Sequence, residues 1–481
     1  MIRSGVRRRS GFDAAISQIA DYVADYQIRS TVARETAYYC LLDSVGCACA
    51  ALANPQCASM LGPLVAGSVV PHGARVPGTP FVLDPVEATF NTGALIRWLD
   101  YNDTFYGATV VHPSDTLAAV LCVSDWVSQQ RAAHGCKPFT VAEVLDSAIK
   151  AYEIAGVLAL ANAYTTKYRL DHVILVKIAC AAIATHLLGG RCAEIMNAVS
   201  NAWIDGHPLA IYRRGADTGA RKSWASADAA SRGVWLAMMA VKGEMGYASA
   251  LTAPTWGFYD VYCSRTPFSI ERAYGTYVME NVQFKLSYPA AFHAQTAAEA
   301  AVILHGLVKH RIDDIARVEL WTHAYGLSYL DRTGPLKNFA ERDHCLQYII
   351  SIALIFGNIT TKDYEDDAAA DPRIDALRAK TIVREDTRYS SGFVDPRRRS
   401  NANAVRVTFK DGSQSERVEV EYPIGHPHRR NEALPLLMRK FEQNISRTYA
   451  SKKARMVLDA CNDRQRLTTS PVTDFLDLLV V

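Results

Sequence analysis

The chain has 481 residues, of which 49% are hydrophobic and 21% are charged, which is typical of globular proteins and excludes a disordered or fibrous class. The formal net charge is only +3, and basic residues are scattered except at positions 7–9 and 397–399, so the sequence predicts no nucleic-acid partner. Eleven cysteines at irregular spacings, without a CxxC pair, favour a reduced, intracellular compartment.

The longest apolar run, "VILVKIACAAIATHLLGG", is interrupted by Lys177 and His186 and predicts a buried helix rather than a membrane span. We therefore expect no membrane partner. The N-terminus has no apolar stretch of the kind found in secretory signals, although it is Arg-rich and acid-poor like a short mitochondrial presequence. These features predict a cytoplasmic protein, with the mitochondrial matrix as the alternative for a eukaryotic source.

A helical pattern extends from Phe12 to about Ala250. Apolar residues recur three and four positions apart in "FDAAISQIADYVADY", and "TAYYCLLDSVGCACAAL" is apolar on all sides. The stretch "TVAEVLDSAIKAYEIAGVLALANAY" opens with a capping box of Thr140 and Glu143. Further helices are predicted in "SDTLAAVLCVSDWVSQQ", "VKIACAAIATHLLG", "CAEIMNAVSNAWID" and "SADAASRGVWLAMMAVKG". The pattern predicts a large all-α domain over residues 1–270.

The pattern changes after residue 270. "TYVMENVQFKLSYP" and "ARVELWTHAY" are typical of strands, and "AVRVTFKDGSQSERVEVEYPIGH" predicts a hairpin around Asp411 and Gly412. Helical stretches lie between the strands at 290–308 and 342–356, so residues 271–427 are predicted to form a smaller α+β lid domain. The helical tail, 428–481, is expected to return to the first domain. The fold class is therefore mainly α, and two domains imply a cleft between them.

One polar stretch, "RWLDYNDTFYGATVVHPSD", fits neither helix nor strand periodicity. Ser114 or Asp115 is expected to cap a helix that begins near Thr116, which places His112 just outside a helix N-terminus. Asp100, Asp103 and Thr104 approach from the preceding turn and could hold one tautomer of a histidine. The plainer alternative is that the aspartates cap helices and His112 bridges two of them.

Three other stretches carry candidate residues. "RRGADTGARKSWASADAASR" holds Arg213, Arg214, Arg221, Lys222 and Arg232, which suit a polyanionic ligand but also a solvated basic loop. Lys285 lies on a predicted strand, where a lone lysine usually reaches to water, and His293 opens a helix. His172 directly precedes another helix.

Together and in this order, these stretches resemble the MmgE/PrpD family, and within it the enzymes that act on 2-methylcitrate. "YEIAGVLALANAYTTKYRLDHVILVKIA", "GEMGYASALTAPTWGFYDV", "YGTYVMENVQFKLSYPAAFHAQTAAEAA", "GPLKNFAERDHCLQY" and "VEYPIGHPHRR" contribute, and the resemblance extends from about Phe12 to "DFLDLLVV". It implies a homodimer with a site between the domains and no metal, iron–sulfur cluster or other cofactor. The missing CxxC agrees, because such clusters are held by closely spaced cysteines.

The resemblance also implies the activity, a hydro-lyase reaction that converts 2-methylcitrate, a small tricarboxylate, to 2-methyl-cis-aconitate in the methylcitrate cycle of propionate breakdown. Elimination of water needs a base, an acid and cations beside the carboxylates. By similarity to related cis-aconitate decarboxylases, the implied site residues are Asp100, Thr104, His112, His172, Lys285, Lys222, Arg221 and Tyr329.

The implied roles are a proton transfer by His112, which Asp100 orients, and binding of a carboxylate by Thr104. Lys285, Lys222 and Arg221 would neutralise carboxylates. The sequence departs from the decarboxylases at Ser231, where they have a lysine, and in "TFYGATVV", which is more apolar than in the family.

Other activities remain open at this point. Citrate or cis-aconitate could be side substrates, because one methyl group changes binding by only roughly 1–3 kcal/mol. A cis-aconitate decarboxylase, or another lyase or epimerase of the same family, is the enzymatic alternative. The non-enzymatic alternative is a catalytically silent helical dimer that binds a ligand or serves as a scaffold. Loss of His112, Asp100 or Lys285 would mark such a protein, and all three are present.

Overall fold

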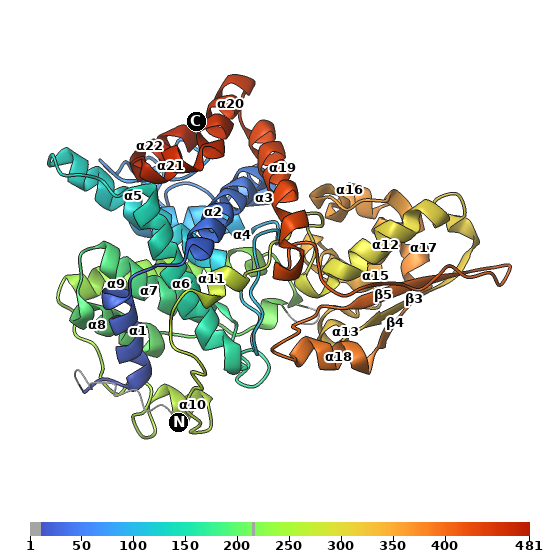
Figure 1. Cartoon of the computed structure of the whole chain (residues 1–481), viewed down its shortest axis with the longest axis horizontal. Coiled ribbons are helices and arrows are strands. Elements are labelled where there is room, and N and C mark those ends of the chain that lie inside the picture. Colours follow the sequence, from blue (N-terminus) through green and yellow to red (C-terminus); the bar gives the residue numbers. More distant parts are fainter. Residues whose placement is uncertain (1–10, 214–216) are drawn as a thin grey trace.

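The computed structural model describes residues 11–213 and 217–481 and confirms the mainly α class with a smaller sheet-containing part (Figure 1). The basic positions 7–9, most of the presequence-like N-terminus and Arg214 lie outside the described residues. Two hydrophobic cores organise the chain. One joins residues 15–286 to residues 433–479 and defines the helical domain, and the other spans residues 288–409 and defines the sheet domain.

Long helices build the helical domain. They are α1 (Ala14–Asp25), α2 (Thr31–Ala51), α4 (Pro85–Arg97), α5 (Leu117–Ala133), α6 (Val141–Ala161), α7 (Val173–Leu187), α8 (Cys192–Ile204) and α9 (Arg221–Val241). The predicted capping box of Thr140 and Glu143 is present at the start of α6. Shorter elements connect these helices: α3 (Pro55–Ala58), β1 (Ala74–Arg75), β2 (Val82–Leu83), the 3-10 turns η1 (Pro113–Thr116) and η2 (Ile211–Arg213), α10 (Phe258–Tyr262) and α11 (Tyr277–Asn281).

Helix α7 contains most of the long apolar run and is buried apart from His186, as predicted. Its Lys177 does not reach bulk water, because its ammonium group donates to the carbonyls of Asp205 and Gly206 at 2.8 and 3.0 Å. Within residues 11–213 and 217–481, none of the helices has both the length and the apolar character that crossing a bilayer requires.

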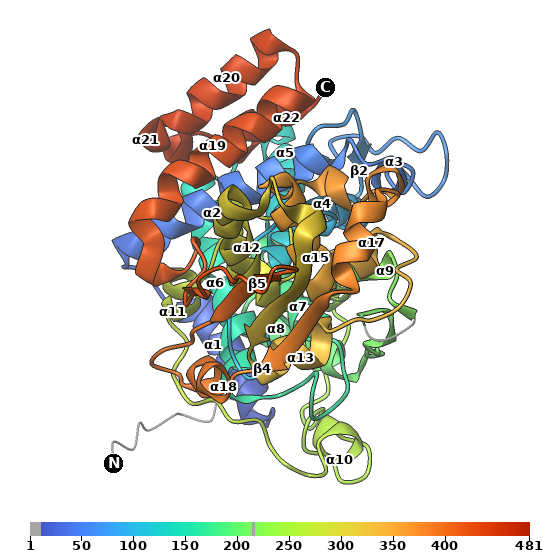
Figure 2. The same cartoon turned by 90° about the vertical axis from the view of Figure 1, so that its right-hand side faces the viewer.

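A four-stranded sheet in the order β4-β3-β5-β6 forms the centre of the sheet domain (Figure 2). Strand β3 (Ile315–Thr322) pairs parallel with β4 (Thr381–Glu385) and antiparallel with β5 (Asn403–Phe409), which pairs with β6 (Val418–Val420). The predicted hairpin around Gly412 is therefore confirmed, and this glycine has the positive φ of 84° that the turn needs.

Helix α12 (Gln295–Val308) lies on strands β5 and β6 and helix α15 (Leu346–Phe356) lies beside α12 and β4, and their apolar sides form the second core. The remaining elements are η4 (Phe292–Ala294), η5 (Ile312–Asp314), α13 (Ala324–Leu330), α14 (Phe339–Arg342), η6 (Thr361–Tyr364), α16 (Asp366–Ala369), α17 (Pro372–Arg378) and α18 (Thr387–Val394). Several of them lie in the long crossover between β3 and β4, which parallel pairing requires.

The C-terminal helices return to the helical domain, as predicted. They are α19 (Arg430–Thr448), α20 (Ser451–Asn462), α21 (Arg464–Thr469) and α22 (Val472–Leu479), preceded by η7 (Pro427–Arg429). Helix α19 lies beside α2, and both views show the C-terminal helices (red) over the same side of the helical domain (Figures 1 and 2). The buried Lys440 of α19 donates to Asp43 Oδ1 at 2.6 Å and to the carbonyls of Tyr101 and Lys285 at 2.7 and 2.8 Å. This tail therefore fixes two chain segments that carry candidate site residues.

Two sequence predictions near the site are wrong. The stretch 276–289 is not a strand of the sheet: it forms α11 and then an extended segment, joined to the helical domain by an isolated bridge between Gln283 and Thr104. Buried Val282, Phe284 and Leu286 alternate along this segment, which explains its strand-like pattern. Lys285 thus lies on an extended segment whose neighbouring residues, Phe284 and Leu286, belong to the first core.

The second wrong prediction concerns the cap of α5. This helix begins at Leu117, after η1, and neither Ser114 nor Asp115 caps it. Both side chains turn to the preceding loop instead, where Ser114 donates to the Asp103 carboxylate at 2.7 Å and Asp115 accepts from Asn102 at 3.1 Å. Buried polar groups of that loop take these side chains because they have no access to water.

Candidate active site

A cavity of about 320 Å³ lies between the two domains, which is the size of a small-molecule site. Polar side chains of the helical domain form one wall, and the sheet domain supplies the other. The helical wall includes Arg97, Asp100, His112, Asp171, His172 and Arg213, and the opposite wall includes His293, Tyr325, Tyr329, His344, Phe393 and Arg399.

Asp100 is the centre of a buried ion network. It follows α4 in a left-handed conformation, with a φ of 48° that non-glycine residues seldom adopt away from functional sites. Its carboxylate accepts a hydrogen bond from Arg97 and one from Lys285 Nζ at 2.8 Å, and Lys285 also donates to its carbonyl at 2.8 Å. Burial alone would raise the pKa of Asp100, but Arg97 and Lys285 hold it well below its usual range. Asp100 is therefore an anion in the native protein.

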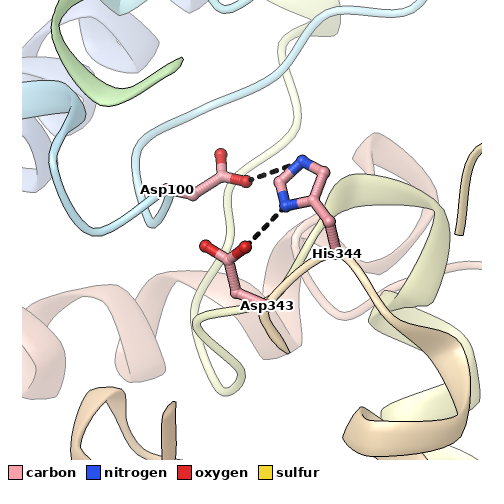
Figure 3. Close-up of side chains that lie close together, drawn as sticks. All are labelled: Asp100, Asp343 and His344. Atoms are coloured by element: carbon pink, nitrogen blue, oxygen red, sulfur yellow. Dashed lines mark hydrogen bonds and ion pairs between the residues drawn. The ribbon is translucent and has the colours of Figure 1, made fainter. Parts of the chain in front are cut away.

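A second ion cluster, formed by Asp343 and His344 of the sheet domain with Lys222 of the helical domain, lies beside Asp100, and Figure 3 shows its two sheet-domain members. Lys222, at the start of α9, donates to both carboxylate oxygens of Asp343 at 2.7 and 2.6 Å. Asp343 Oδ1 lies 2.7 Å from His344 Nδ1, and His344 Nε2 lies 3.7 Å from Asp100 Oδ2. Burial and the nearby Lys222 lower the pKa of His344 to about 4. His344 is therefore neutral near pH 7, and its single N–H is donated from Nδ1 to Asp343.

The cluster of Asp100, Asp343 and His344 has ligand atoms close enough together for a metal ion, all within 4.8 Å of one another. Its carboxylates, however, are already neutralised by protein cations. Lys222 bonds both oxygens of Asp343, and Arg97 and Lys285 share Asp100 Oδ1. A divalent cation would lie beside these groups and be repelled by them. The donor set fits an ion-pair network better than a resident metal.

His112 is held as a neutral ring. Its Nδ1 lies 2.8 Å from the Asp103 carbonyl and 3.2 Å from Thr104 Oγ1, so the Nδ1 proton is donated to the carbonyl and Nε2 carries the lone pair. Burial, together with nearby Arg97 and Lys285, keeps the pKa of His112 well below its usual value of 6.5. Asp100 was expected to orient this ring, whereas the partners of its Nδ1 are the Asp103 carbonyl, which accepts the proton, and Thr104.

The loop that carries His112 is fixed by the Asp103 carboxylate. Ser114 donates to it through its backbone N–H at 3.0 Å and its hydroxyl at 2.7 Å, and Tyr152 donates to its other oxygen at 2.8 Å. Burial raises the pKa of Asp103 to about 6. Because the carbonyl of the same residue binds the imidazole, these contacts set the position of His112.

His172 lies beside His112, with ring centroids 5.5 Å apart, but its surroundings differ. Its Nδ1 bonds Asp171 Oδ1 at 2.8 Å, and Asp171 Oδ2 accepts from Arg213 Nε at 2.6 Å. Its Nε2 lies 3.9 Å from Asp115 Oδ2. Although burial opposes ionisation, Arg213 and His172 hold the pKa of Asp171 well below its usual range. Two carboxylates therefore flank His172, one beside each ring nitrogen.

The structure brings most of the expected residues together around this cavity, but in different layers. Asp100, His112, His172 and Tyr329 line it, whereas Thr104, Lys222 and Lys285 stand behind the lining and bond other side chains. Arg221 is not part of the cluster, because its guanidinium pairs with Asp228 at 2.9 Å in a partly exposed position on α9.

Sequence reasoning overlooked several charged residues of the cavity and its network: Arg97, Asp171, Asp343, His344 and Arg399. For Arg97 and Asp171 there was a signal, since each lies next to or near a selected residue in a largely apolar stretch. Asp343 and His344 occur in "ERDHCLQY", which looks like an ordinary polar helix start. Their importance depends on partners that are distant in the sequence.

Comparisons with known proteins agree with this picture. The MmgE/PrpD N-terminal domain matches residues 17–271, and the MmgE/PrpD C-terminal domain matches residues 288–464. The chain is 51% identical to 2-methylcitrate dehydratase of Salmonella typhimurium over 476 residues, 98% of each chain. It is 45% identical to "2-methylcitrate dehydratase, mitochondrial" of Yarrowia lipolytica, covering 98% of this chain and 91% of that one. It is 40% identical to the "2-methylcitrate dehydratase-like protein oryR" of Aspergillus oryzae, covering 98% of this chain and 96% of the relative.

Proposed function

Because the chain belongs to the MmgE/PrpD family, we propose that it is a hydro-lyase that dehydrates 2-methylcitrate to 2-methyl-cis-aconitate. The observation that carries the proposal is the 51% identity, over 98% of both chains, to a protein that is named for this activity. The interdomain cavity supports it, because it places several imidazoles and arginines around a space of about 320 Å³.

His112 is proposed as the base that removes the hydrogen next to a carboxylate. It presents a lone pair on Nε2, and its low pKa keeps it unprotonated in the empty site. A weak base suits this step poorly, but a bound trianion would favour the protonated ring and raise the pKa of His112 toward neutrality. The substrate would thus strengthen the base that attacks it.

His172 is proposed as the group that protonates the departing hydroxide. Its ring lines the cavity next to His112, and the carboxylates of Asp171 and Asp115 lie beside its two nitrogens. The two histidines differ in their surroundings, because carboxylates lie beside His172, whereas a backbone carbonyl and a hydroxyl group contact His112. Asp100 in the lining, with Lys285 and Lys222 behind it, would then set the electrostatic potential, and Tyr329 would contact the substrate from α13.

Two further expectations belong to this proposal. We propose a homodimer, because large apolar side chains are exposed on the helical domain between residues 204 and 262, among them Leu209 (64% exposed) and Trp256 (84%). Light scattering would test it, since Trp256→Asp should shift a dimer toward monomer. A cytoplasmic location is proposed for a bacterial source and the mitochondrial matrix for a eukaryotic one, in line with the relative that is named mitochondrial.

The activity is tested by incubating the purified protein with 2-methylcitrate, citrate and cis-aconitate while following the ultraviolet absorbance of the alkene and identifying the products. We expect an unsaturated tricarboxylate from 2-methylcitrate and little product from His112→Gln. Itaconate and carbon dioxide from cis-aconitate would indicate the decarboxylase instead. No turnover of any of the three acids, with a folded protein, would reject the enzymatic proposal.

A further inference from the structure

The cavity contains one arginine that no aspartate neutralises within the described part of the chain. Three arginines and two aspartates line it: Arg97, Arg213, Arg399, Asp100 and Asp171. Arg97 bonds Asp100, and Arg213 bonds Asp171. The acceptor of Arg399 is a neutral group instead, the carbonyl of Tyr106, at 2.8 Å from Nη1. The lining therefore has one uncompensated positive charge, and the sheet domain supplies it.

Arg399 is held in place by its backbone and by aromatic rings. It follows α18 in a left-handed conformation with a φ of 45°, and its N–H donates to the Asp395 carbonyl at 2.8 Å. Its guanidinium carbon lies 5.7 Å from the ring centre of Phe105 and 5.6 Å from that of Tyr277. The left-handed backbone and the two rings thus fix a half-buried cation in the lining of the cavity.

Its two neighbours provide a contrast. The Arg397 side chain is 91% exposed and lies 3.6 Å from Asp395, and Arg398 pairs with Glu421 at 2.5 Å on the surface. Neither lines the cavity. Of the basic triplet 397–399, only Arg399 points to the interdomain space.

We propose that Arg399 binds one carboxylate of the substrate from the sheet domain, and that it thereby sets the preference for tricarboxylates over dicarboxylates. This inference rests on the proposed function. A guanidinium has five N–H groups, of which the Tyr106 carbonyl takes one, so donors remain for a two-pronged contact with a carboxylate. The rings of Phe105 and Tyr277 near its guanidinium reduce the local dielectric constant, which strengthens such an ion pair.

The first test compares Arg399→Gln with Arg397→Gln, which removes the same charge two residues away. Binding of tricarballylate, an unreactive tricarboxylate without the hydroxyl group, is measured by calorimetry at fixed ionic strength, and kcat and KM are measured with 2-methylcitrate. We expect Arg399→Gln to weaken tricarballylate binding about 10- to 100-fold, with a matching rise in KM and a smaller change in kcat. Arg397→Gln should bind as the unmodified protein does.

The second test removes the carboxylate instead of the arginine. Glutarate lacks the central carboxylate of tricarballylate, and methylsuccinate lacks a terminal one. If Arg399 pairs with one particular carboxylate, Arg399→Gln should leave the affinity for one of these two acids nearly unchanged. If Arg399 has a purely structural role and only holds the sheet domain to Tyr106, Arg399→Gln should bind all three acids more weakly by the same factor. Its melting temperature should also fall.

The inference would be overturned if Arg399→Gln lost affinity for all three acids by the same factor. It would also be overturned if Arg397→Gln and Arg399→Gln lost the same affinity for tricarballylate. Unchanged binding in Arg399→Gln would overturn it as well. Its failure can be distinguished from failure of the proposed function, because in the latter case the unmodified protein itself would neither bind tricarballylate nor convert 2-methylcitrate.

Discussion

Replacement of Lys440 by methionine tests whether the C-terminal tail holds the site together. Lys440 is 5% exposed, and its ammonium group bonds the Asp43 carboxylate and the carbonyls of Tyr101 and Lys285. Methionine fills a similar volume but donates no hydrogen bond. Asp43, which is 2% exposed, would become a buried charge without its partner. Loss of one partner from a buried pair costs about 3–5 kcal/mol, so we expect the free energy of unfolding of the helical domain to fall by that amount.

The same variant should lower the activity, because the carbonyls that Lys440 binds belong to Tyr101, which follows Asp100, and to Lys285 itself. The assay is denaturant unfolding followed by circular dichroism, combined with kcat/KM in buffer without denaturant. The control is the double variant Asp43→Asn with Lys440→Met, which removes both charges. It should recover about 1–3 kcal/mol of the loss. A single variant that is destabilised by less than about 1 kcal/mol, or a double variant no better than the single one, would refute the reasoning.

Four other outcomes are expected. His112→Gln should lower kcat about 10²- to 10⁴-fold with little change in stability, and an undiminished kcat would exclude His112 as the base. The active form has a neutral His112, so activity falls as the pH drops through its pKa; that pKa is depressed in the free enzyme and raised by the bound trianion. The acid limb of the kcat profile should therefore lie at higher pH than the acid limb of the kcat/KM profile, after kcat/KM is corrected for ionisation of the free substrate. Acid limbs at the same pH would contradict this expectation. Activity should survive prolonged treatment with a chelator, since protein cations pair with the carboxylates of the Asp100–Asp343 cluster. If activity is lost and the addition of one metal ion restores it, the cluster is a metal site and not an ion-pair network. Thr140→Ala removes the capping box of α6, so the free energy of unfolding should fall by about 1 kcal/mol while kcat stays unchanged. An unchanged free energy of unfolding would show that the cap contributes little.

Most of the helices could be predicted because their burial requires a visible apolar pattern. Helix α7 is apolar along almost its whole length, and the hairpin of β5 and β6 alternates around Gly412. Strand β4 could not be predicted in this way. It lies at the edge of the sheet and pairs with β3 alone, and only Thr381 among its residues is buried, so its sequence carries no alternation.

The site could be predicted only where its residues are close in the sequence. Asp100, Thr104 and His112 occur in one short polar stretch, and their spacing within an apolar region made them visible. The pair of Lys222 and Asp343 is separated by 121 residues, so nothing in either local sequence indicates it. The orientation of His112 also depends on the Asp103 carbonyl, and a backbone acceptor leaves no trace in the identity of a side chain.

The pairing of cations with aspartates in this cavity has a physical reason beyond the binding of an anion. Arg97, Lys285 and Lys222 lie close together in a buried place, and without Asp100 and Asp343 their mutual repulsion would destabilise the folded chain. The two carboxylates reduce that repulsion and leave the potential at His112 positive enough to keep its ring neutral. A trianionic substrate would outweigh the small positive charge that remains and raise the pKa of His112. His112 can thus become a stronger base when substrate binds, because its surroundings are close to neutral. Asp100→Asn removes one negative charge, so the ring should be a weaker base even with substrate bound. The variant should therefore have a lower kcat at every pH above the acid limb.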